Sequence, residues 1–165
     1  MSVKPISVPV QLPNPALPSA NWADCYQLTI AAPGLTAIGA ARLVVGHFPL
    51  WVRMLMTLRN RIVSPFGIKS SEVHSPREME MVGIFPVVSK SRDRLVLGFD
   101  DRHLDFRLVI TVEPVAGGGQ RVSATSLVYR KILLGKIYIA IVAPFHRLIV
   151  ARMLARLGRR DLAIS

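Results

Sequence analysis

Residues 104–113, LDFRLVITVE, decide the fold class, because apolar and polar side chains alternate along them. Every second position is apolar: Leu104, Phe106, Leu108, Ile110 and Val112. Asp105, Arg107, Thr111 and Glu113 are among the residues between them. Successive side chains of a β-strand point to opposite faces of a sheet. The stretch therefore predicts a strand with one apolar face, which needs another element to cover it.

Segments on both sides of this stretch predict the rest of a sheet. The strands expected nearby are Gly83–Ser89, Arg94–Phe99 and Arg121–Arg130, with a turn at Gly117–Gly119. Their short connections favour an antiparallel meander. Further upstream, Asp24–Ala31 is rich in β-forming residues and stops at Pro33-Gly34, so it predicts a first strand.

Three helices are expected, and the last of them decides the architecture. Leu35–His47 is rich in alanine, and Leu50–Val63 carries an apolar stripe on helical spacing, at Trp51, Leu55, Leu58 and Ile62. The third helix runs roughly from Leu133 to Gly158, with Pro144 inside it, where a proline should bend it. Only this helix is long enough to cross the sheet, so we predict an α+β, helix-grip fold.

Composition fits one domain of ordinary size. The chain has 165 residues, of which 51% are hydrophobic and 19% charged, and this excludes overall disorder. Residues 1–20 are rich in proline and predict an extended N-terminal segment, followed by a single domain over residues 21–165. No membrane span is expected, because the apolar run Ile137–Phe145 is too short for one.

The charge and the cysteine content restrict the partners and the compartment. The net charge of +11 would attract polyanions, but arginines spread singly along the chain favour a role in solubility. Nucleic-acid binding is not expected, because aromatic residues make up only 7% of the chain. The N-terminus has no signal-peptide pattern, and the single cysteine, Cys25, agrees with a reducing cytoplasm. One cysteine and four scattered histidines match no zinc-ligand spacing, and no cofactor is expected.

Four segments together resemble a known family. They are Trp22-Ala23-Asp24, WVRMLMTLRNRIVSPFGIK at residues 51–69, LVLGFDDRHLDFRL at 95–108, and GKIYIAIVAPFHRLIVARML at 135–154. They resemble a bacterial family catalogued as a domain of unknown function, which also occurs fused to short-chain-dehydrogenase-like proteins. The resemblance implies a helix-grip fold similar to START and pollen-allergen-like domains. Members of that superfamily often bind lipids, sterols or other apolar molecules, and the resemblance implies no established activity.

Few residues are candidates for chemistry. His146 shares one side of the last helix with Val150 and Met153, so it should face the sheet. There it could fix the polar end of a ligand or act as acid or base, or simply donate to a backbone carbonyl that Pro144 frees. Asp101, His103 and Asp105 alternate at a hairpin tip, where turn formation explains them better than a metal site does. Arg53 would flank the mouth of a cup and could bind an anionic group, but a solvated face paired with Glu72, Glu78 or Glu80 explains it better.

Three functions remain open at this point. The favoured one is a module that binds a hydrophobic or lipid-like molecule in an apolar cavity. Its candidate binding residues are His146, Arg53, His103, Asp105, Phe106, Leu108 and Val150. The alternative is an interaction or membrane-peripheral module that meets an anionic membrane surface or an acidic protein through Arg152, Arg156, Arg159 and Arg160. The third is an enzyme that acts on an apolar substrate with His146 as acid or base, which is less favoured because spacing alone names no partner for His146. The sequence leaves the oligomeric state open.

Overall fold

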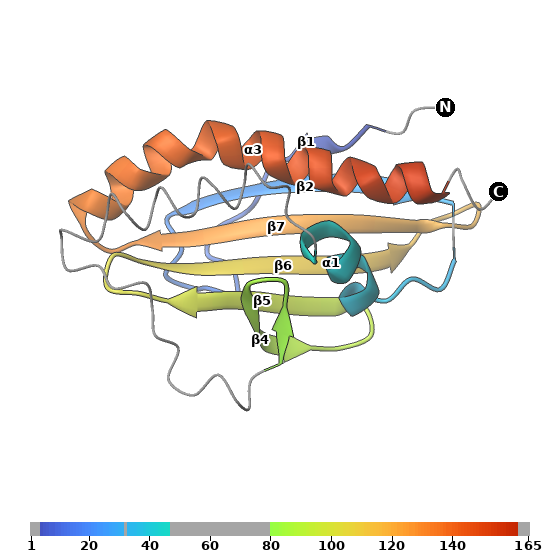
Figure 1. The fold of residues 1–165 in the computed structure, drawn as a ribbon, viewed down its shortest axis with the longest axis horizontal. Helices are drawn as coiled ribbons and strands as arrows, with labels where there is room; N and C mark the ends of the chain where they lie inside the picture. The colour runs from blue at the N-terminus through green and yellow to red at the C-terminus, as the bar shows by residue number, and fades with distance from the viewer. Residues whose placement is uncertain (1–3, 32, 47–79, 162–165) are drawn as a thin grey trace.

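The fold is α+β, with a curved antiparallel sheet and a long C-terminal helix across it (Figure 1). A computed structural model describes residues 4–31, 33–46 and 80–161. The elements in chain order are β1 (Ile6–Val8), β2 (Trp22–Ile30), α1 (Ala37–Val45), β3 (Met81–Val82), β4 (Phe85–Lys90), β5 (Arg94–Asp100), β6 (Leu104–Pro114), β7 (Gln120–Arg130) and α3 (Leu133–Asp161). The strand order within the described residues is β1-β2-β7-β6-β5-β4-β3.

Strand β7 pairs with one strand from the N-terminal part of the chain and one from the C-terminal part. It pairs with β6, its neighbour in sequence, and on its other side with β2, in a register that runs from Trp22 opposite Val128 to Ile30 opposite Gln120. The first core strand is thereby held beside the last one. Helix α3 begins directly after β7. The chain reverses its direction there, and α3 lies along β2 and β7 (Figure 1).

The side of the sheet that faces the helices holds the main core. Strands β2, β5, β6 and β7 present to it apolar side chains that include Leu28, Leu97, Ile110 and Val122. Helix α3 contributes Val150, Met153, Leu154 and Leu157, and α1 contributes Ala37, Ala40, Ala41 and Val44. Full burial of a side chain such as Leu or Val stabilises a fold by roughly 1.5–3 kcal/mol, so this one-sided packing decides where α3 lies.

Hydrogen bonds hold the two residues that precede helix α1. The hydroxyl of Thr36 accepts a hydrogen bond from the Gly39 amide at 3.2 Å, which caps the N-terminus. The side chain of Gln120 on β7 makes two hydrogen bonds to the backbone of Leu35, at 2.8 and 3.1 Å. Small alanines on the inner face then allow α1 to pack closely between α3 and the sheet.

The opposite side of the sheet carries a second, smaller core. Leu17 and Ala20 of the N-terminal segment pack there against Val96, Val109 and Leu127. Val10 and Ala16, which lie nearby, are half-buried in the same cluster. The proline-rich segment thus covers the outer face, and β1 extends the sheet at its edge. The domain boundary expected at residue 20 stays a prediction.

The turn between β5 and β6 fixes the place where α3 begins. The carbonyl of His103 accepts a hydrogen bond from the Lys131 amide at 2.9 Å. The Lys131 ammonium group donates to the Asp101 carbonyl at 2.8 Å and lies 2.6 Å from the Asp105 carboxylate. Gly135, in the first turn of α3, comes so close that a β-carbon there would lie 2.6 Å from the His103 carbonyl oxygen. The hairpin tip therefore serves as a support for the corner between β7 and α3.

Most predicted elements are confirmed, with small shifts at their ends. The strands expected at residues 24–31, 94–99, 104–113 and 121–130 correspond to β2, β5, β6 and β7, and the last helix corresponds to α3. The strand expected at Gly83–Ser89 corresponds to β4, and Gly83, with a φ of 63°, lies in the turn that joins β3 to β4. Gly117–Gly119 forms the expected turn, with positive φ at all three residues. The helix expected at Leu50–Val63 lies outside the described residues.

Helix α3 also meets the criterion for a membrane span by length and composition. The stretch Leu133–Arg159 is long and apolar enough to cross a bilayer, although Lys136 and Arg147 interrupt it. From the sequence no span is expected, because the apolar run between these two charges is short. The core helix of a soluble protein meets the same criterion. Of the most apolar window, 17% is fully buried in the fold.

Gly135→Ala should destabilise the protein by about 1–3 kcal/mol, because the added methyl group would overlap a backbone carbonyl that cannot move freely. In an ordinary helix the same change stabilises by about 1 kcal/mol, so the sign is diagnostic. Urea unfolding measures it, with Lys136→Ala at the neighbouring exposed position as the control. A rise in stability on Gly135→Ala would show that the corner is not tightly packed.

Candidate functional site

A polar pair interrupts the apolar face of the sheet beneath α3. Asp24 on β2 and Ser126 on β7 are directly opposite each other in the register. Both are buried, with exposed fractions of 8% and 0%. Their neighbours on the same face are Trp22 opposite Val128 and Tyr26 opposite Ala124. A carboxylate and a hydroxyl therefore lie side by side where the strand pattern calls for apolar residues.

His146 of α3 reaches this pair from above. Its Nε2 atom lies 2.8 Å from the Ser126 hydroxyl oxygen and 3.6 Å from Oδ1 of Asp24. Trp22 packs edge-on against the imidazole, with ring centroids 6.0 Å apart. The histidine thus faces the sheet as expected, and it contacts a side-chain hydroxyl instead of a backbone carbonyl freed by Pro144.

The three side chains do not form a nucleophilic triad. In such a triad the carboxylate holds Nδ1 of the histidine while the serine contacts Nε2. Here Ser126 and Asp24 both approach Nε2. Ser126 is also fully buried, which leaves no access for a substrate carbonyl. The geometry fits a polar anchor better than an acyl-transfer site.

Asp24 is the least satisfied residue of the cluster. Within the described part of the chain, neither of its carboxylate oxygens has a hydrogen-bond partner. The contact to His146, at 3.6 Å, is too long for a hydrogen bond. A buried polar group without a partner costs about 1–3 kcal/mol, and more when it is charged. Such a residue in a native fold calls for an explanation, and a ligand is one.

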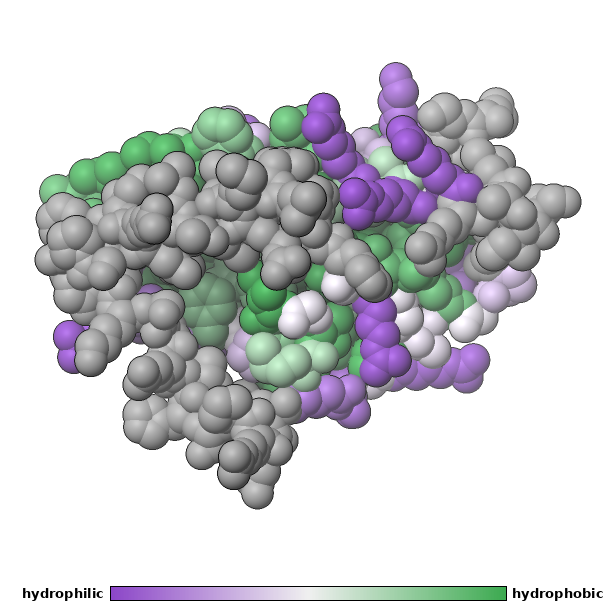
Figure 2. All heavy atoms as spheres, viewed as in Figure 1, coloured by the Kyte–Doolittle hydropathy of each residue, from purple (hydrophilic) through white to green (hydrophobic). Residues whose placement is uncertain are grey.

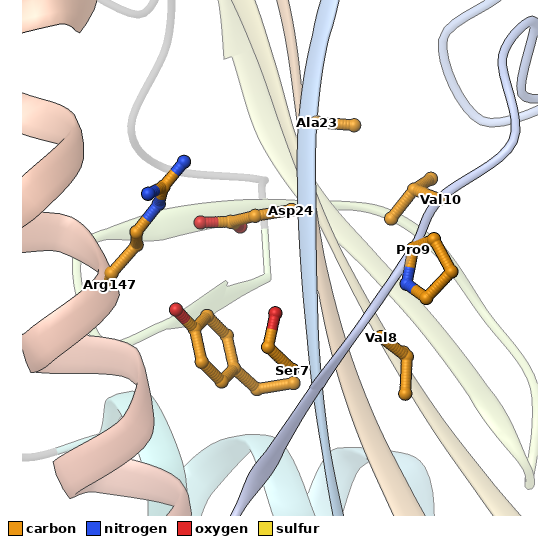
Figure 3. Close-up of a pocket in the computed structure, with 8 residues that line it drawn as sticks. Ser7, Val8, Pro9, Val10, Ala23, Asp24 and Arg147 are labelled. Atoms are coloured by element: carbon orange, nitrogen blue, oxygen red, sulfur yellow. The ribbon is translucent and has the colours of Figure 1, made fainter.

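An open groove runs past Asp24 at the edge of the sheet. Its volume is about 570 Å³, within the range of small-molecule sites. The groove forms where β1 stops pairing with β2, after Val8. It is lined by Ser7, Val8, Pro9, Val10, Ala23, Asp24, Tyr26 and Arg147. In Figure 3, Asp24 on β2 and Arg147 on α3 extend toward each other, while Val8, Pro9 and Val10 lie on the other side of β2.

The groove combines groups of opposite charge. Asp24 supplies an anion and Arg147 a cation, but the structure gives no ion pair between them within the described residues. Burial raises the pKa of the Tyr26 phenol, the nearby Asp24 charge raises it further, and Arg147 acts in the opposite direction. The phenol therefore stays protonated and can donate or accept a hydrogen bond.

The hairpin-tip candidates are not part of this cluster and make structural contacts instead. His103 Nδ1 is 3.4 Å from Asp101, and Asp105 pairs with Lys131 at the corner of α3. Arg107 pairs with Asp100 at 2.7 Å, and its hydrogen bond holds the pKa of that carboxyl below its ordinary value. Among the described residues the structure gives no ion pair between Asp105 and Arg107. Among the residues described, no three His, Cys, Asp or Glu side chains are grouped for a metal ion.

The apolar candidates belong to the packed interior. Leu108 and Val150 are buried in the main core. Phe106 is half-buried and packs against Phe85 and Phe99, with centroid distances of 5.5 and 5.7 Å. Arg53 lies outside the described residues. Of the residues named from the sequence, the structure brings His146 alone to the polar cluster, among the parts of the chain that it describes.

Three residues of the site escaped the sequence analysis: Asp24, Ser126 and Arg147. A signal was present, because Asp24 and Ser126 are polar residues at inner-face positions of β2 and β7, where most of the other residues are apolar. One polar residue in such a pattern means little by itself. Only the pairing of strands a hundred residues apart makes them neighbours.

Asp24→Asn should raise the free energy of unfolding by about 1 kcal/mol, because it removes a buried charge that has no hydrogen-bond partner. Thermal or urea unfolding of the purified protein measures the change. Glu113→Gln, an exposed acid-to-amide change on β6, should stay within about 0.5 kcal/mol of the original protein. A loss of stability on Asp24→Asn would mean that the contact with His146 already stabilises the carboxylate.

Comparison with known proteins places the polar cluster beneath α3 inside one family domain. No curated protein matches the chain. The model of a family described as "Protein of unknown function (DUF2867)" matches residues 16–153, which include β2, β7 and most of α3. Asp24, Ser126, His146 and Arg147 all fall within the matched range. The chain therefore belongs to the DUF2867 family, whose function is unknown.

Proposed function

We propose that the protein is a small-molecule-binding module, whose ligand lies in the groove between β1, β2 and α3. The observation that carries this proposal is the Asp24 carboxylate, which is buried at the groove without a hydrogen-bond partner among the described residues. A ligand that donates hydrogen bonds to it would repay the cost of its burial. Binding sites commonly retain such strained polar groups because the ligand, and not the protein, satisfies them.

The lining of the groove restricts the chemistry of the ligand. Asp24 accepts hydrogen bonds, Arg147 donates them, and the Tyr26 phenol can do either. Val8, Pro9 and Val10 supply an apolar wall. The best fit is a small molecule with an apolar body and one polar end, at which an amine or hydroxyl group meets Asp24 and an acceptor group meets Arg147.

The binding role is the one expected from the sequence, but the binding site lies at a different place in the fold. The favoured expectation was a hydrophobic molecule in an apolar cavity, with His146 at its polar end. The residues expected to line that cavity, Leu108 and Val150, are packed in the core, so the groove at the sheet edge is the better candidate. A relationship to START-like helix-grip proteins of bacteria is part of the same proposal, and the element order supports it.

His146 acts in this proposal as a positioning residue. Its hydrogen bond to Ser126 and its contact with Trp22 fix the ring beside Asp24. The ring thereby covers one side of the carboxylate. His146→Ala should weaken ligand binding less than Asp24→Asn, because it removes the support and not the contact.

The test has two steps, which begin with native mass spectrometry of the purified protein to detect a bound small molecule. A fragment screen by ¹H–¹⁵N NMR, with apolar amines and alcohols as probes, follows. We expect shifts at the amides of Ser7, Val8, Asp24, Tyr26 and Arg147. Asp24→Asn should weaken binding at least about 10-fold, since a hydrogen bond to a charged group contributes roughly 1.5–3 kcal/mol.

The matched control is Glu113→Gln, the same acid-to-amide change away from the groove. It should leave the affinity unchanged. Probes that shift only residues of the main core would contradict the groove as the site. An absence of shifts at the groove with every probe, together with no co-purified molecule, would contradict the binding function itself.

A further inference from the structure

The outer face of α3 carries a stripe of exposed apolar side chains. Its members are Leu133, Ile137, Ile141, Phe145 and Leu148, each between 46% and 70% exposed. Their spacing of four, four, four and three residues places them on one side of the helix. At 1.5 Å per residue the stripe is about 22 Å long. Ala140 and Pro144, which are also exposed, lie between its members and add no polar group.

Such a stripe is unusual on a surface helix. The inner face of α3 is already buried on the sheet through Ile139, Val150, Met153 and Leu157. The helix therefore has apolar side chains on its inner face and, over its first half, also on its outer face, whereas a helix at the edge of a globular fold normally has a polar outer face. Large exposed apolar patches mark interaction sites.

The same outer face becomes basic in the second half of the helix. Arg152, Arg156 and Arg159 are exposed there and follow the stripe on helical spacing. No acidic residue occurs in α3 before Asp161. Figure 2 shows hydrophobic side chains along the first half of α3 and a gathering of hydrophilic ones over its second half. One face thus offers an apolar segment and then a cationic one.

We propose that this face docks onto a membrane surface rich in anionic lipid, with the helix lying on the bilayer and not crossing it. The apolar stripe would enter the boundary of the acyl chains, and the arginines would meet the headgroup phosphates and carboxylates. The inner face stays on the sheet, because its removal would expose the main core. This inference is independent of the ligand groove and goes beyond it.

Two other occupants fit the surface less well. A second copy of the chain would bring arginines against arginines if the helices ran parallel, or against the apolar stripe if they ran antiparallel. An acidic protein would match the arginines but would also need an apolar ridge beside its acidic groups. A bilayer offers both an apolar layer for the stripe and an anionic headgroup layer for the arginines. The apolar stripe needs no hydrogen-bond partner there.

The test is co-sedimentation of the full chain with vesicles of phosphatidylcholine, with and without phosphatidylserine. We expect binding only when phosphatidylserine is present, and weaker binding at high salt. Ile141→Ser with Phe145→Ser should lower the affinity at least about 10-fold, because the inserted apolar area is lost. Arg152→Gln with Arg159→Gln should lower it about 25-fold, at about 5-fold per arginine.

Matched controls lie elsewhere on the surface. Ile84→Ser with Val88→Ser removes exposed apolar side chains at the other edge of the sheet, and Arg94→Gln with Arg121→Gln removes exposed charges. Both pairs should bind within about 2-fold of the original protein, because these residues lie outside the apolar and basic face of α3. Urea unfolding of every variant confirms that the fold is retained.

Several outcomes would overturn the proposal. One is the absence of vesicle binding at low salt; another is equal weakening by the control pairs, which would indicate unspecific charge attraction. A protein that resists extraction from native membranes by alkaline carbonate would span the bilayer instead. A dimer in light scattering that Ile141→Ser with Phe145→Ser disperses, without any vesicle binding, would assign the face to a second copy. Binding to polyglutamate as tight as to vesicles would assign it to an acidic protein.

Discussion

The packing of α3 across β2 and β7 is the constraint on which the rest of the structure depends. Val150, Met153, Leu154 and Leu157 are buried against the sheet and α1, and among the described elements the inner face of the sheet has no other long cover. Once α3 lies there, its first turn must meet the tip of the β5–β6 hairpin, which requires Gly135. His146 must then descend onto the sheet opposite Asp24 and Ser126.

That geometry gives the two sides of one helix different tasks. The inner side brings an imidazole and a guanidinium group to a carboxylate that the fold leaves without a hydrogen bond among its described residues. An apolar substitute for this polar cluster would pack with less cost, so stability does not explain why the cluster exists. The outer side carries apolar and basic groups that the sheet does not use. A ligand would offset the cost of the buried carboxylate, and a lipid surface would offset the cost of the exposed apolar side chains.

The order of the elements was predictable because it rests on local periodicity. The alternation over residues 104–113 and the length of the last helix were enough for the sheet and its cover. The site was predictable only at His146, whose spacing on the helix pointed inward. Asp24 and Ser126 could not be placed, because their proximity depends on the pairing of β2 with β7, and strand partners far apart in sequence leave no local pattern. The outer stripe on α3 was missed because the charged residues Lys136 and Arg147 divide the apolar run.

Native-state hydrogen exchange tests most directly whether α3 is the cover of the sheet. We expect the amides of Val150–Leu157 to exchange only through global unfolding, with the same free energy as the central amides of β6 and β7. Rapid exchange along α3 while β6 and β7 stay protected would contradict this. The helix would then be detached from the sheet, and neither the groove at Asp24 nor the docking face would exist in the form described.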